Sequence, residues 1–557
     1  MKQSKTKRIW GNIIFIIALF LLSNNLPAQL TNPHSAFSRQ DTLRGSVTPQ
    51  RAWWDLLHYH LEVQVIPETK TLKGSNTITF EILDDGTTMQ IDLQKPMDVT
   101  KVVYKGGEVD FEREGSVYWI VLDDDKTPGD EGKITIYFEG VPKEAVRPPW
   151  DGGITWTTDE NGNPFIASSN QGIGASIWWP NKDHPSDEPD NGMMISVRTP
   201  DNLMDVSNGR LVLEEDHGDN TKTWHWKVDN PINNYGVNIN IGDYVYFGEK
   251  YPGEKGELDM DYYVLRHNLD KAKEHFKDAR RTMEAFEYWF GPYPFYEDSY
   301  KLVDAPYLGM EHQSSVTYGN GYQKGYRGTD LSRSGWGLKF DFIIIHESGH
   351  EWFANNITYK DVADMWIHES FTNYSENLYL EYFFGPEAGR EYVIGTRLGI
   401  QNDRPIIGEY NVDHRGSGDM YNKGGNMLHT IRQIINDDLL WREILRGLNK
   451  EFYHQTVTTE QVENYISEQA GKDLSKVFDQ YLRDVRIPVL EYSFKDGNLM
   501  YRWSNAVRGF DMPIKIWIDG ESTMLEPLTN WKSMSSEGTA LKVDVNYYVG
   551  SMNTLGK

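Results

Sequence analysis

The residues best suited to chemistry are two histidines that flank a glutamate in the segment 343–350, which reads Ile-Ile-Ile-His-Glu-Ser-Gly-His. On a helix, His346 and His350 project from one face and can bind a single Zn²⁺. Glu347 lies beside them, where a carboxylate can act as a general base toward a water molecule that the metal activates. The motif predicts a zinc hydrolase. The alternative is a core helix with two hydrogen-bonded histidines.

A catalytic zinc site needs a third protein ligand, and its fourth position is left to water and substrate. Glu369 follows His350 after eighteen residues, in a segment whose apolar and aromatic residues recur at helical spacing. Residues 355–358 predict a turn or short extended link, so a return helix would bring Glu369 beside both histidines. His368 is an alternative donor, and a solvated helix-face carboxylate is the alternative interpretation of Glu369.

The segment 366–372 reads Trp-Ile-His-Glu-Ser-Phe-Thr. Together with the histidine motif, it resembles the gluzincin aminopeptidases of the aminopeptidase N and leukotriene hydrolase family, whose corresponding segment is W-x-x-E-G-[FL]-[AT]. Ser370 stands where that family usually has glycine. The resemblance implies His346, His350 and Glu369 as ligands of one Zn²⁺ per chain, with Glu347 as the catalytic base.

An upstream segment, 308–312, reads Leu-Gly-Met-Glu-His and is similar to the family's G-x-M-E-N, with His312 in place of asparagine. The resemblance implies that Gly309, Met310 and Glu311 bind the substrate's amino terminus. A carboxylate fixed near the scissile carbonyl pairs with a terminal ammonium and admits one residue ahead of the cut. The alternative is an ordinary strand glutamate.

Two further segments complete the resemblance. Residues 421–424, Tyr-Asn-Lys-Gly, are similar to the family's Y-x-K-G, which implies that Tyr421 donates a hydrogen bond to the developing oxyanion. Residues 168–171, Ser-Ser-Asn-Gln, resemble its T-Q-x-Q, which implies that Gln171 helps Glu311 to hold the amine. A helix-start tyrosine and a plain turn are the alternatives.

The resemblance implies a zinc-dependent aminopeptidase that removes N-terminal residues from peptide substrates. Three alternatives remain open. A thermolysin-type endopeptidase would also cut N-blocked peptides, an epoxide or ester hydrolase would use the same scaffold on another bond, and a non-catalytic protein would only bind peptides.

The first 28 residues predict a signal peptide, because four basic residues precede the apolar run 13–22, which is short for a membrane span. We therefore expect an exported protein, periplasmic or extracellular. Only an uncleaved N-terminal segment would place it at a membrane. The net charge of −26 disfavours nucleic acid as a partner, and no cysteine is present to form a disulfide. Nothing in the sequence sets an oligomeric state.

A chain of 557 residues predicts several domains. After a linker at 29–44, apolar and polar residues alternate through 45–248, which predicts an N-terminal antiparallel β-sheet domain. Apolar spacing becomes helical in 249–487, for example over 271–290, 340–355 and 427–448. This part is expected to be a thermolysin-like, mainly helical zinc catalytic domain. Residues 488–557 return to strands and predict a small β-sandwich, so the fold class is multidomain α+β.

Overall fold

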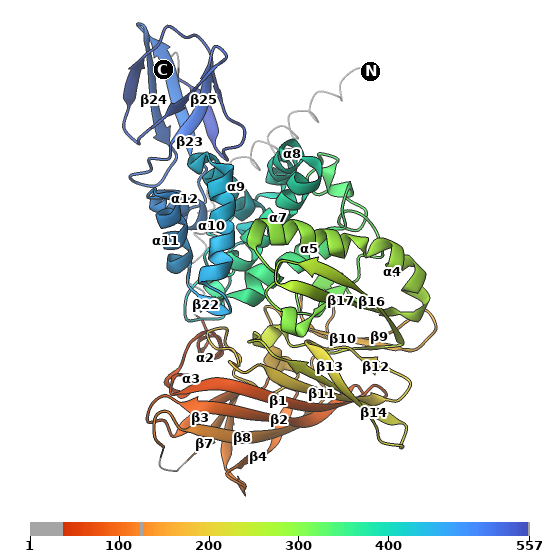
Figure 1. Cartoon of the computed structure of the whole chain (residues 1–557). Coiled ribbons are helices and arrows are strands. Elements are labelled where there is room, and N and C mark those ends of the chain that lie inside the picture. The colour runs from red at the N-terminus through yellow and green to blue at the C-terminus, as the bar shows by residue number, and fades with distance from the viewer. Residues whose placement is uncertain (1–36, 123–125, 555–557) are drawn as a thin grey trace, which may run out of the picture.

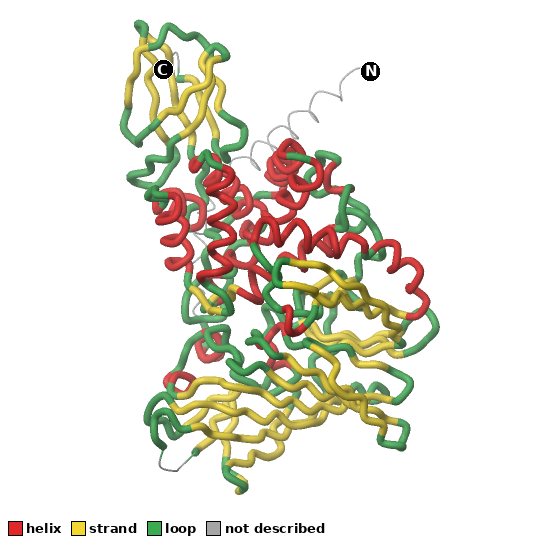
Figure 2. The backbone as a smooth tube through the Cα atoms, in the orientation of Figure 1, coloured by secondary structure: helices red, strands yellow, loops and turns green. Residues whose placement is uncertain are grey.

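The computed structural model describes residues 37–122 and 126–554. An N-terminal β region, a mainly helical region and a group of C-terminal strands are stacked in that order (Figure 1). Figure 2 shows the helices gathered in the middle of the molecule with strands at both ends. This confirms the predicted N-terminal β domain and helical catalytic domain. The predicted signal peptide lies outside the described residues, among which no helix is long and apolar enough to cross a membrane.

The β domain is built on an eight-stranded sheet in the order β13-β14-β11-β1-β2-β8-β4-β5. Along its long strands β1 (Trp54–Ile66), β2 (Thr71–Ile82) and β8 (Glu131–Gly140), buried residues largely alternate with more exposed ones, as expected for a sheet with one face on a core. Its other strands are β4 (Asp98–Tyr104), β5 (Gly107–Glu108), β11 (Met193–Pro200), β13 (Arg210–Asp216) and β14 (Thr221–Val228). The prediction of an antiparallel sheet needs one correction, because β1 pairs with β11 in parallel. A long crossover joins these two strands, and a crossover is what parallel pairing requires.

Two smaller sheets complete this domain. One contains β12 (Met204–Asp205), β15 (Asn240–Gly242), β10 (Pro164–Ser169) and β9 (Gly153–Thr158). The other contains β3 (Thr88–Asp92), β7 (Val117–Val121) and β6 (Phe111–Glu114). Strand β10 ends two residues before Gln171, so the sheet fixes the start of the loop that carries this residue.

The catalytic domain begins with a five-stranded sheet in the order β16-β17-β18-β20-β19. Its strands are β16 (Tyr244–Gly253), β17 (Gly256–Leu265), β18 (Tyr300–Asp304), β19 (Gly309–Met310) and β20 (Val316–Tyr318). The short strand β19 is at the edge of this sheet and leads directly into Glu311. The edge position leaves one side of β19 without a strand neighbour, so a bound peptide can lie beside it.

Helices cover this sheet and form most of the domain: α4 (Leu269–His275), α5 (Lys277–Phe290), α6 (Phe342–Gly349), α7 (Trp366–Phe384), α8 (Pro386–Thr396), α9 (Asn422–Ile435), α10 (Asp438–Glu451), α11 (Thr459–Ala470) and α12 (Ser475–Leu482). Helix α7 is buried around its whole circumference from Trp366 to Leu380, as expected for a central core helix. It contacts α6, α8 and α9. The third-ligand segment is therefore held in the middle of the domain.

The predicted helix over 340–355 is shorter than expected. Helix α6 ends at Gly349, and residues 351–356 form a wider π-type turn in which Phe353 and Ala354 leave helical backbone geometry. Strand β21 (Ile357–Tyr359) follows and pairs with β22 (Gln455–Val457). Apolar spacing continues through the turn because its residues remain buried, so periodicity alone does not reveal the break.

The described part of the predicted linker 29–44 is not a linker. Helix α2 (Arg39–Gly45) begins at Ser38, whose side chain forms a capping box with Asp41. Leu43 is buried, and Arg44 forms an ion pair with Asp413 of the catalytic domain at 2.8 Å. The capping signal was present in the sequence, but the apolar residue and the distant partner that stabilise so short a helix were not apparent.

Seven strands follow α12. Four form one sheet, β27-β24-β23-β29, and three form a second, β26-β25-β28. Their bounds are β23 (Val489–Lys495), β24 (Asn498–Ser504), β25 (Ile514–Ile518), β26 (Glu521–Leu525), β27 (Lys532–Ser535), β28 (Leu541–Val543) and β29 (Gly550–Asn553). Arg397 donates hydrogen bonds to the carbonyls of Val545 and Asn546, which attaches these strands to the catalytic domain.

Candidate active site

The structure brings His346, His350 and Glu369 together from two helices. His346 is in α6, His350 is at the end of α6 and Glu369 is in the first turn of α7. The Nε2 atoms of His346 and His350 lie 3.8 and 3.4 Å from Glu369 Oε2, and one ligand atom from each residue fits within a 4.8 Å group. All three side chains are buried. Two imidazoles and one carboxylate are the donor set of a catalytic zinc site.

A divalent cation fits this cluster for a further reason. Glu369 Oε2 is buried and has no hydrogen-bond partner among the residues that the structure describes, which is costly for a carboxylate unless a cation binds it. Glu311, Glu347 and His350 form a second group of the same size. The first group is the better zinc site because it offers two imidazoles and the unpartnered oxygen. The second places Glu311 and Glu347 around the same small space.

The other ring nitrogen of each histidine is held by a partner. His346 Nδ1 donates to Glu376 Oε1 at 2.9 Å, and the Tyr392 hydroxyl donates to Glu376 Oε2 at 2.6 Å. His350 Nδ1 donates to the carbonyl of Phe353 at 3.0 Å, and Thr372 Oγ1 lies 3.1 Å from the same nitrogen. These contacts fix the tautomers that present both Nε2 lone pairs to a metal. The break in the helix after His350 gives Phe353 the position that its carbonyl needs.

Glu347 is buried beside the histidines. Burial is the largest cause that raises the pKa of its carboxyl to about 7, and the Glu311 carboxylate acts in the same direction. A carboxyl that titrates near neutral pH suits a general base, and a cation in the cluster would lower this pKa by Coulomb attraction. Gly309 makes room for it, because a Cβ at this position would lie 3.0 Å from Glu347 Oε1 and 2.6 Å from Ile343 Cγ2.

Gln171 connects the β domain to the catalytic residues. Its amide nitrogen donates to Glu311 Oε1 at 2.7 Å and to Glu369 Oε1 at 3.1 Å. Asn355 of the π-type turn donates to the Glu311 carbonyl at 2.9 Å. The Glu311 carboxylate and the buried side chain of Met310 are thereby fixed next to the metal cluster. A buried carboxylate in this position can bind a cationic ammonium.

The two residues that differ from the family pattern, His312 and Ser370, each form a hydrogen bond within the protein. His312 is buried, its Nδ1 accepts a hydrogen bond from Asn238 Nδ2 at 3.0 Å, and burial lowers its pKa to about 3. Ser370 donates to the Met420 carbonyl at 2.7 Å and so joins α7 to the segment before Tyr421. His368, the alternative ligand, accepts from the backbone N–H of Tyr359 at 2.9 Å and faces the Tyr235 hydroxyl at 3.5 Å. It lies outside both candidate metal groups.

Tyr421 precedes α9, and its ring stacks on His346 with ring centroids 6.1 Å apart. Burial raises the pKa of its phenol well above 10, and the carboxylates of Glu369 and Glu311 add to the rise. The hydroxyl therefore stays protonated and can donate a hydrogen bond. Its contact with Glu369 places it next to the metal cluster, where an oxyanion would form.

Sequence reasoning missed Glu376, Thr372 and Tyr235. Glu376 and Thr372 are seven and three residues after Glu369 on α7, so the helical period places them on the same face as the ligand. That signal was available. Tyr235 is a hydrogen-bond partner of Glu311 from the β domain, and no local spacing connects it to the site.

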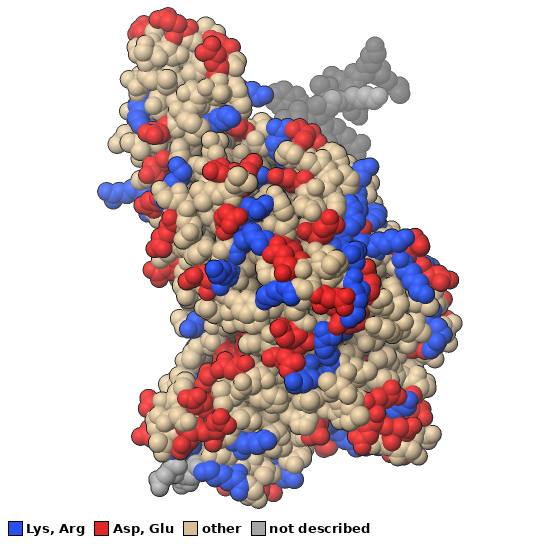
Figure 3. Space-filling model, in the orientation of Figure 1, with Lys and Arg blue, Asp and Glu red and all other residues tan. Residues whose placement is uncertain are grey.

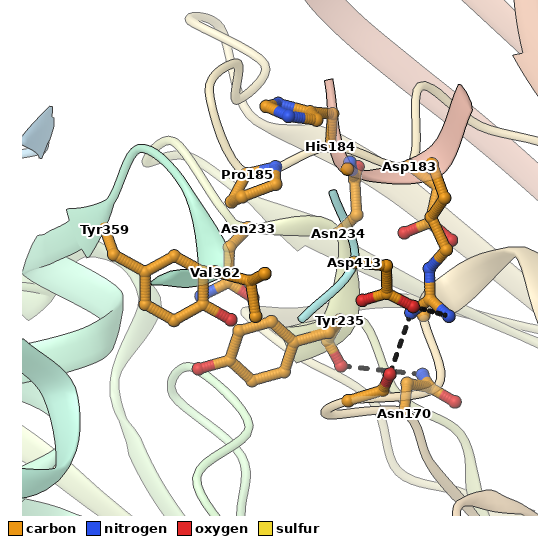
Figure 4. A pocket seen from close by; sticks show the side chains of 14 residues that line it. Asn170, Asp183, His184, Pro185, Asn233, Asn234, Tyr235, Tyr359, Val362 and Asp413 are labelled. Atoms are coloured by element: carbon orange, nitrogen blue, oxygen red, sulfur yellow. Dashed lines mark hydrogen bonds and ion pairs between the residues drawn. The ribbon is translucent and has the colours of Figure 1, made fainter. Parts of the chain in front are cut away.

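Space for ligands lies between the two domains on the β-domain side of the cluster. Tyr235 and Asn170 come to one pocket from the β domain, and Tyr359, Val362 and Asp413 come from the catalytic domain (Figure 4). A second, larger cavity shares Val362 and Asp413 with it and is also lined by Gln171. Gln171 therefore joins the larger of these two cavities to the cluster, since its amide also contacts Glu311 and Glu369.

Comparison with known families gives two matches. Residues 56–235 match the Peptidase M1 N-terminal domain, and residues 274–481 match the Peptidase family M1 domain. The second match contains all three candidate metal ligands. The two matches lie in the β domain and the catalytic domain respectively.

The sequence is also similar to those of individual aminopeptidases and of a leukotriene A-4 hydrolase. The chain is 21% identical to leukotriene A-4 hydrolase of Xenopus laevis over 440 residues, 74% of this chain and 68% of that protein. It is 23% identical to aminopeptidase N of Lactobacillus helveticus over 478 residues, 79% of this chain, but spans only 52% of that protein's length. It spans 35% of the length of aminopeptidase M1 of Arabidopsis thaliana.

A similar solved structure is the M1 zinc metallopeptidase from Deinococcus radiodurans, with a TM-score of 0.66 and 19% identity. The match covers 78% of this chain and 96% of that one. The fold is therefore shared over nearly the whole of that chain. The two family matches, over residues 56–235 and 274–481, show that the chain belongs to peptidase family M1.

Proposed function

We propose that this protein is a zinc-dependent aminopeptidase that removes single residues from the amino terminus of peptides. One observation supports this most directly: the Glu311 carboxylate, held by Gln171 at 2.7 Å, belongs to the same 4.8 Å group as Glu347 and His350. An ammonium bound at Glu311 leaves room for only one residue before the bond that Glu347 can reach. An endopeptidase has no use for a buried carboxylate at this position.

One Zn²⁺ per chain would be held by His346, His350 and Glu369. When bound, zinc supplies Lewis-acid polarisation of a carbonyl and lowers the pKa of a water molecule. The protein's part is to fix the two imidazoles through Glu376 and Phe353, to keep the surroundings buried and to position the remaining groups.

Glu347 is the base of the reaction. Its carboxylate accepts a proton as the water oxygen attacks the carbonyl carbon of the first peptide bond. The same carboxyl then returns a proton to the amide nitrogen as the C–N bond breaks, so the products are a free amino acid and a peptide shortened by one residue. The base is regenerated without any other proton donor.

Two further groups act on the substrate. The Tyr421 phenol, protonated because burial and two carboxylates raise its pKa, donates a hydrogen bond to the oxygen that gains negative charge. Glu311, oriented by Gln171 and flanked by Gly309 and Met310, binds the ammonium. The carboxylate fixes the register of the peptide, and the phenol stabilises the transition state.

Domain boundaries and cellular location belong to the same proposal. We infer a β domain at 45–248, a catalytic domain at 249–487 and a small β-sandwich at 488–557, with the boundary between the first two falling inside strand β16 (Tyr244–Gly253). The two C-terminal sheets support the sandwich, because the side chains of Leu490 and Trp503 from one sheet and Ile514 and Ile516 from the other are buried in one cluster. Residues 1–28 would direct export to the periplasm or beyond, as their basic start and apolar run predict. An uncleaved segment would anchor the protein to a membrane.

The test is hydrolysis of one short peptide, free and N-acetylated, with and without a zinc chelator. We expect cleavage of the free peptide alone, one residue at a time, with loss of activity on chelation and recovery when zinc is added back. Cleavage of the acetylated peptide at a similar rate would instead identify an endopeptidase. If neither peptide is cut while an epoxide or ester is hydrolysed, the scaffold serves another bond.

A further inference from the structure

An open cavity of ≈ 460 Å³ lies next to the amine site, at the interface of the two domains. Its wall includes Gln171, whose amide also contacts Glu311 and Glu369. The volume is in the range of small-molecule binding pockets. A tripeptide is only about 10 Å long when extended, so a group near the start of a bound peptide can reach this cavity.

The cavity is lined by four basic side chains, Arg44, Lys143, Arg404 and Arg415, and by two acidic ones, Asp151 and Asp413. This excess of positive charge occurs in a chain whose net charge is −26. Elsewhere, on the face shown in Figure 3, basic side chains are interspersed with acidic ones. A local cationic pocket in an acidic protein selects for an anionic group.

Both acidic groups in the wall already have partners. Asp413 pairs with Arg44 at 2.8 Å, and Arg44 also donates to the Gly172 carbonyl at 2.9 Å. The Asp151 carboxylate accepts from the backbone N–H groups of Val146 and Arg147 at 2.9 and 2.8 Å. Asp413 also attracts Arg415 through its charge, but among the described residues neither carboxylate forms a hydrogen bond or an ion pair with Arg404 or Arg415.

Arg415 is the cation without a partner. Among the residues that the structure describes, it makes no hydrogen bond or ion pair, whereas Arg404 donates to the Gly416 carbonyl at 3.2 Å. A Cβ on Gly172 would lie 3.9 Å from Arg415 Nη1, so the guanidinium lies beside the residue that follows Gln171. An unpaired guanidinium at this point has its planar donors available for a carboxylate.

We propose that this pocket binds a carboxylate of the peptide substrate, with Arg415 as the specificity-determining residue and Arg404 beside it. The inference rests on the proposed aminopeptidase function and adds a substrate preference to it. The carboxylate comes either from the carboxyl terminus of a very short peptide or from an acidic side chain near the amino terminus. Both sources present the same planar anion, so the experiment separates them.

The experiment measures kcat and KM for matched tripeptides with the zinc-loaded protein. Leu-Ala-Ala with a free carboxyl terminus is compared with its C-terminal amide, which tests the terminal source. Among amides, Glu-Ala-Ala is compared with Gln-Ala-Ala and Leu-Glu-Ala with Leu-Gln-Ala, which tests an acidic side chain at the first and second positions. We expect about tenfold higher kcat/KM for one of these carboxylate-bearing peptides, the size of a charge-assisted hydrogen bond at a solvent-accessible site.

The variant Arg415→Gln should remove most of that preference through KM, with kcat for the neutral amides unchanged. Its matched control is Arg508→Gln, the same charge change at an exposed position in the turn between β24 and β25. A uniform loss for all peptides in Arg415→Gln would show a structural role and would overturn the proposal. The proposal would also be overturned if Arg415→Gln and Arg508→Gln had the same preference for carboxylate-bearing peptides, because the preference would then not depend on Arg415.

If the wild type cleaves every neutral amide and shows no preference for any carboxylate, the aminopeptidase function stands and the pocket proposal fails. If nothing is cleaved, the proposed function fails, and calorimetric binding of Leu-Ala-Ala and its amide decides the pocket. Tighter binding of the free acid that Arg415→Gln abolishes would support it. Equal binding, or no binding, of the two would overturn it.

Discussion

The side-chain amide of Gln171 donates a hydrogen bond of 2.7 Å to Glu311 Oε1, although the two residues are 140 positions apart and belong to different domains. The bond fixes the direction of the carboxylate. The proposed amine site is therefore completed only when the β domain is docked on the catalytic domain.

The variant Glu311→Gln should lower kcat/KM for free peptides by about 10- to 100-fold, because a neutral amide cannot form the charge-assisted bond to the ammonium. Its zinc content should not change, since Glu311 is outside the preferred triad. Steady-state kinetics with zinc analysis measure both. Glu274→Gln, at an exposed position, is the control, and equal activity in both variants would contradict the anchoring role.

Glu347→Gln should reduce kcat by about 10²- to 10⁴-fold, the usual contribution of a positioned base. The amide has nearly the same shape but cannot accept the proton of the attacking water. Peptide binding and zinc content are expected to persist, which calorimetry and metal analysis can establish. Retention of more than a tenth of the wild-type kcat would assign the base to another residue.

Tyr392→Phe tests the support of the zinc site at a distance. Loss of the hydroxyl removes the 2.6 Å bond to Glu376, and Glu376 orients His346. We expect zinc affinity to fall by about tenfold, the lower end of the range for such supporting groups. Competition with a chelator gives the dissociation constant. Tyr379→Phe is a matched control, because the Tyr379 hydroxyl is buried and has no hydrogen-bond partner within residues 37–122 and 126–554. The two variants should therefore differ.

The buried carboxyl of Glu188 should make the stability of the folded protein depend on pH. Burial raises the pKa of its carboxyl to about 8, and its Oε1 has no partner. The folded state holds this proton more tightly than the unfolded chain. The stabilisation that the protonated Glu188 carboxyl gives to the folded state is therefore fully present below about pH 4.5, and it is lost as pH rises to about 8. Glu188→Gln should flatten the fall in melting temperature over this window, whereas Glu68→Gln, at an exposed position, should not. Parallel curves for wild type and Glu188→Gln would contradict the prediction.

The sequence could predict a site residue where the pattern that indicates it lies within a short stretch of chain. His346, Glu347 and His350 fall within five residues, so local spacing was sufficient. Glu369 required a helical return, which the apolar pattern of α7 supplied. Glu311, Tyr421 and Gln171 were reached only through the resemblance, because no local rule places residues from three separate segments around one cluster.

The differences in fold have a similar origin. The π-type turn after His350 keeps its residues buried, so apolar spacing predicted an unbroken helix. Helix α2 depends on buried Leu43 and on Arg44 pairing with Asp413, a contact between positions far apart in the chain. Periodicity reports which residues are buried, and it does not report how the backbone bends or which distant segment covers it.

The division of the site between two domains has a consequence for how the enzyme controls product length. The proposed zinc ligands and base all lie in the catalytic domain, whereas the proposed amine site combines Glu311 of that domain with Gln171 of the β domain. Separating the domains would leave Glu311 in place without the amide that orients it and would also remove the Gln171 contact with Glu369, so we expect the position of the cut to be set less strictly.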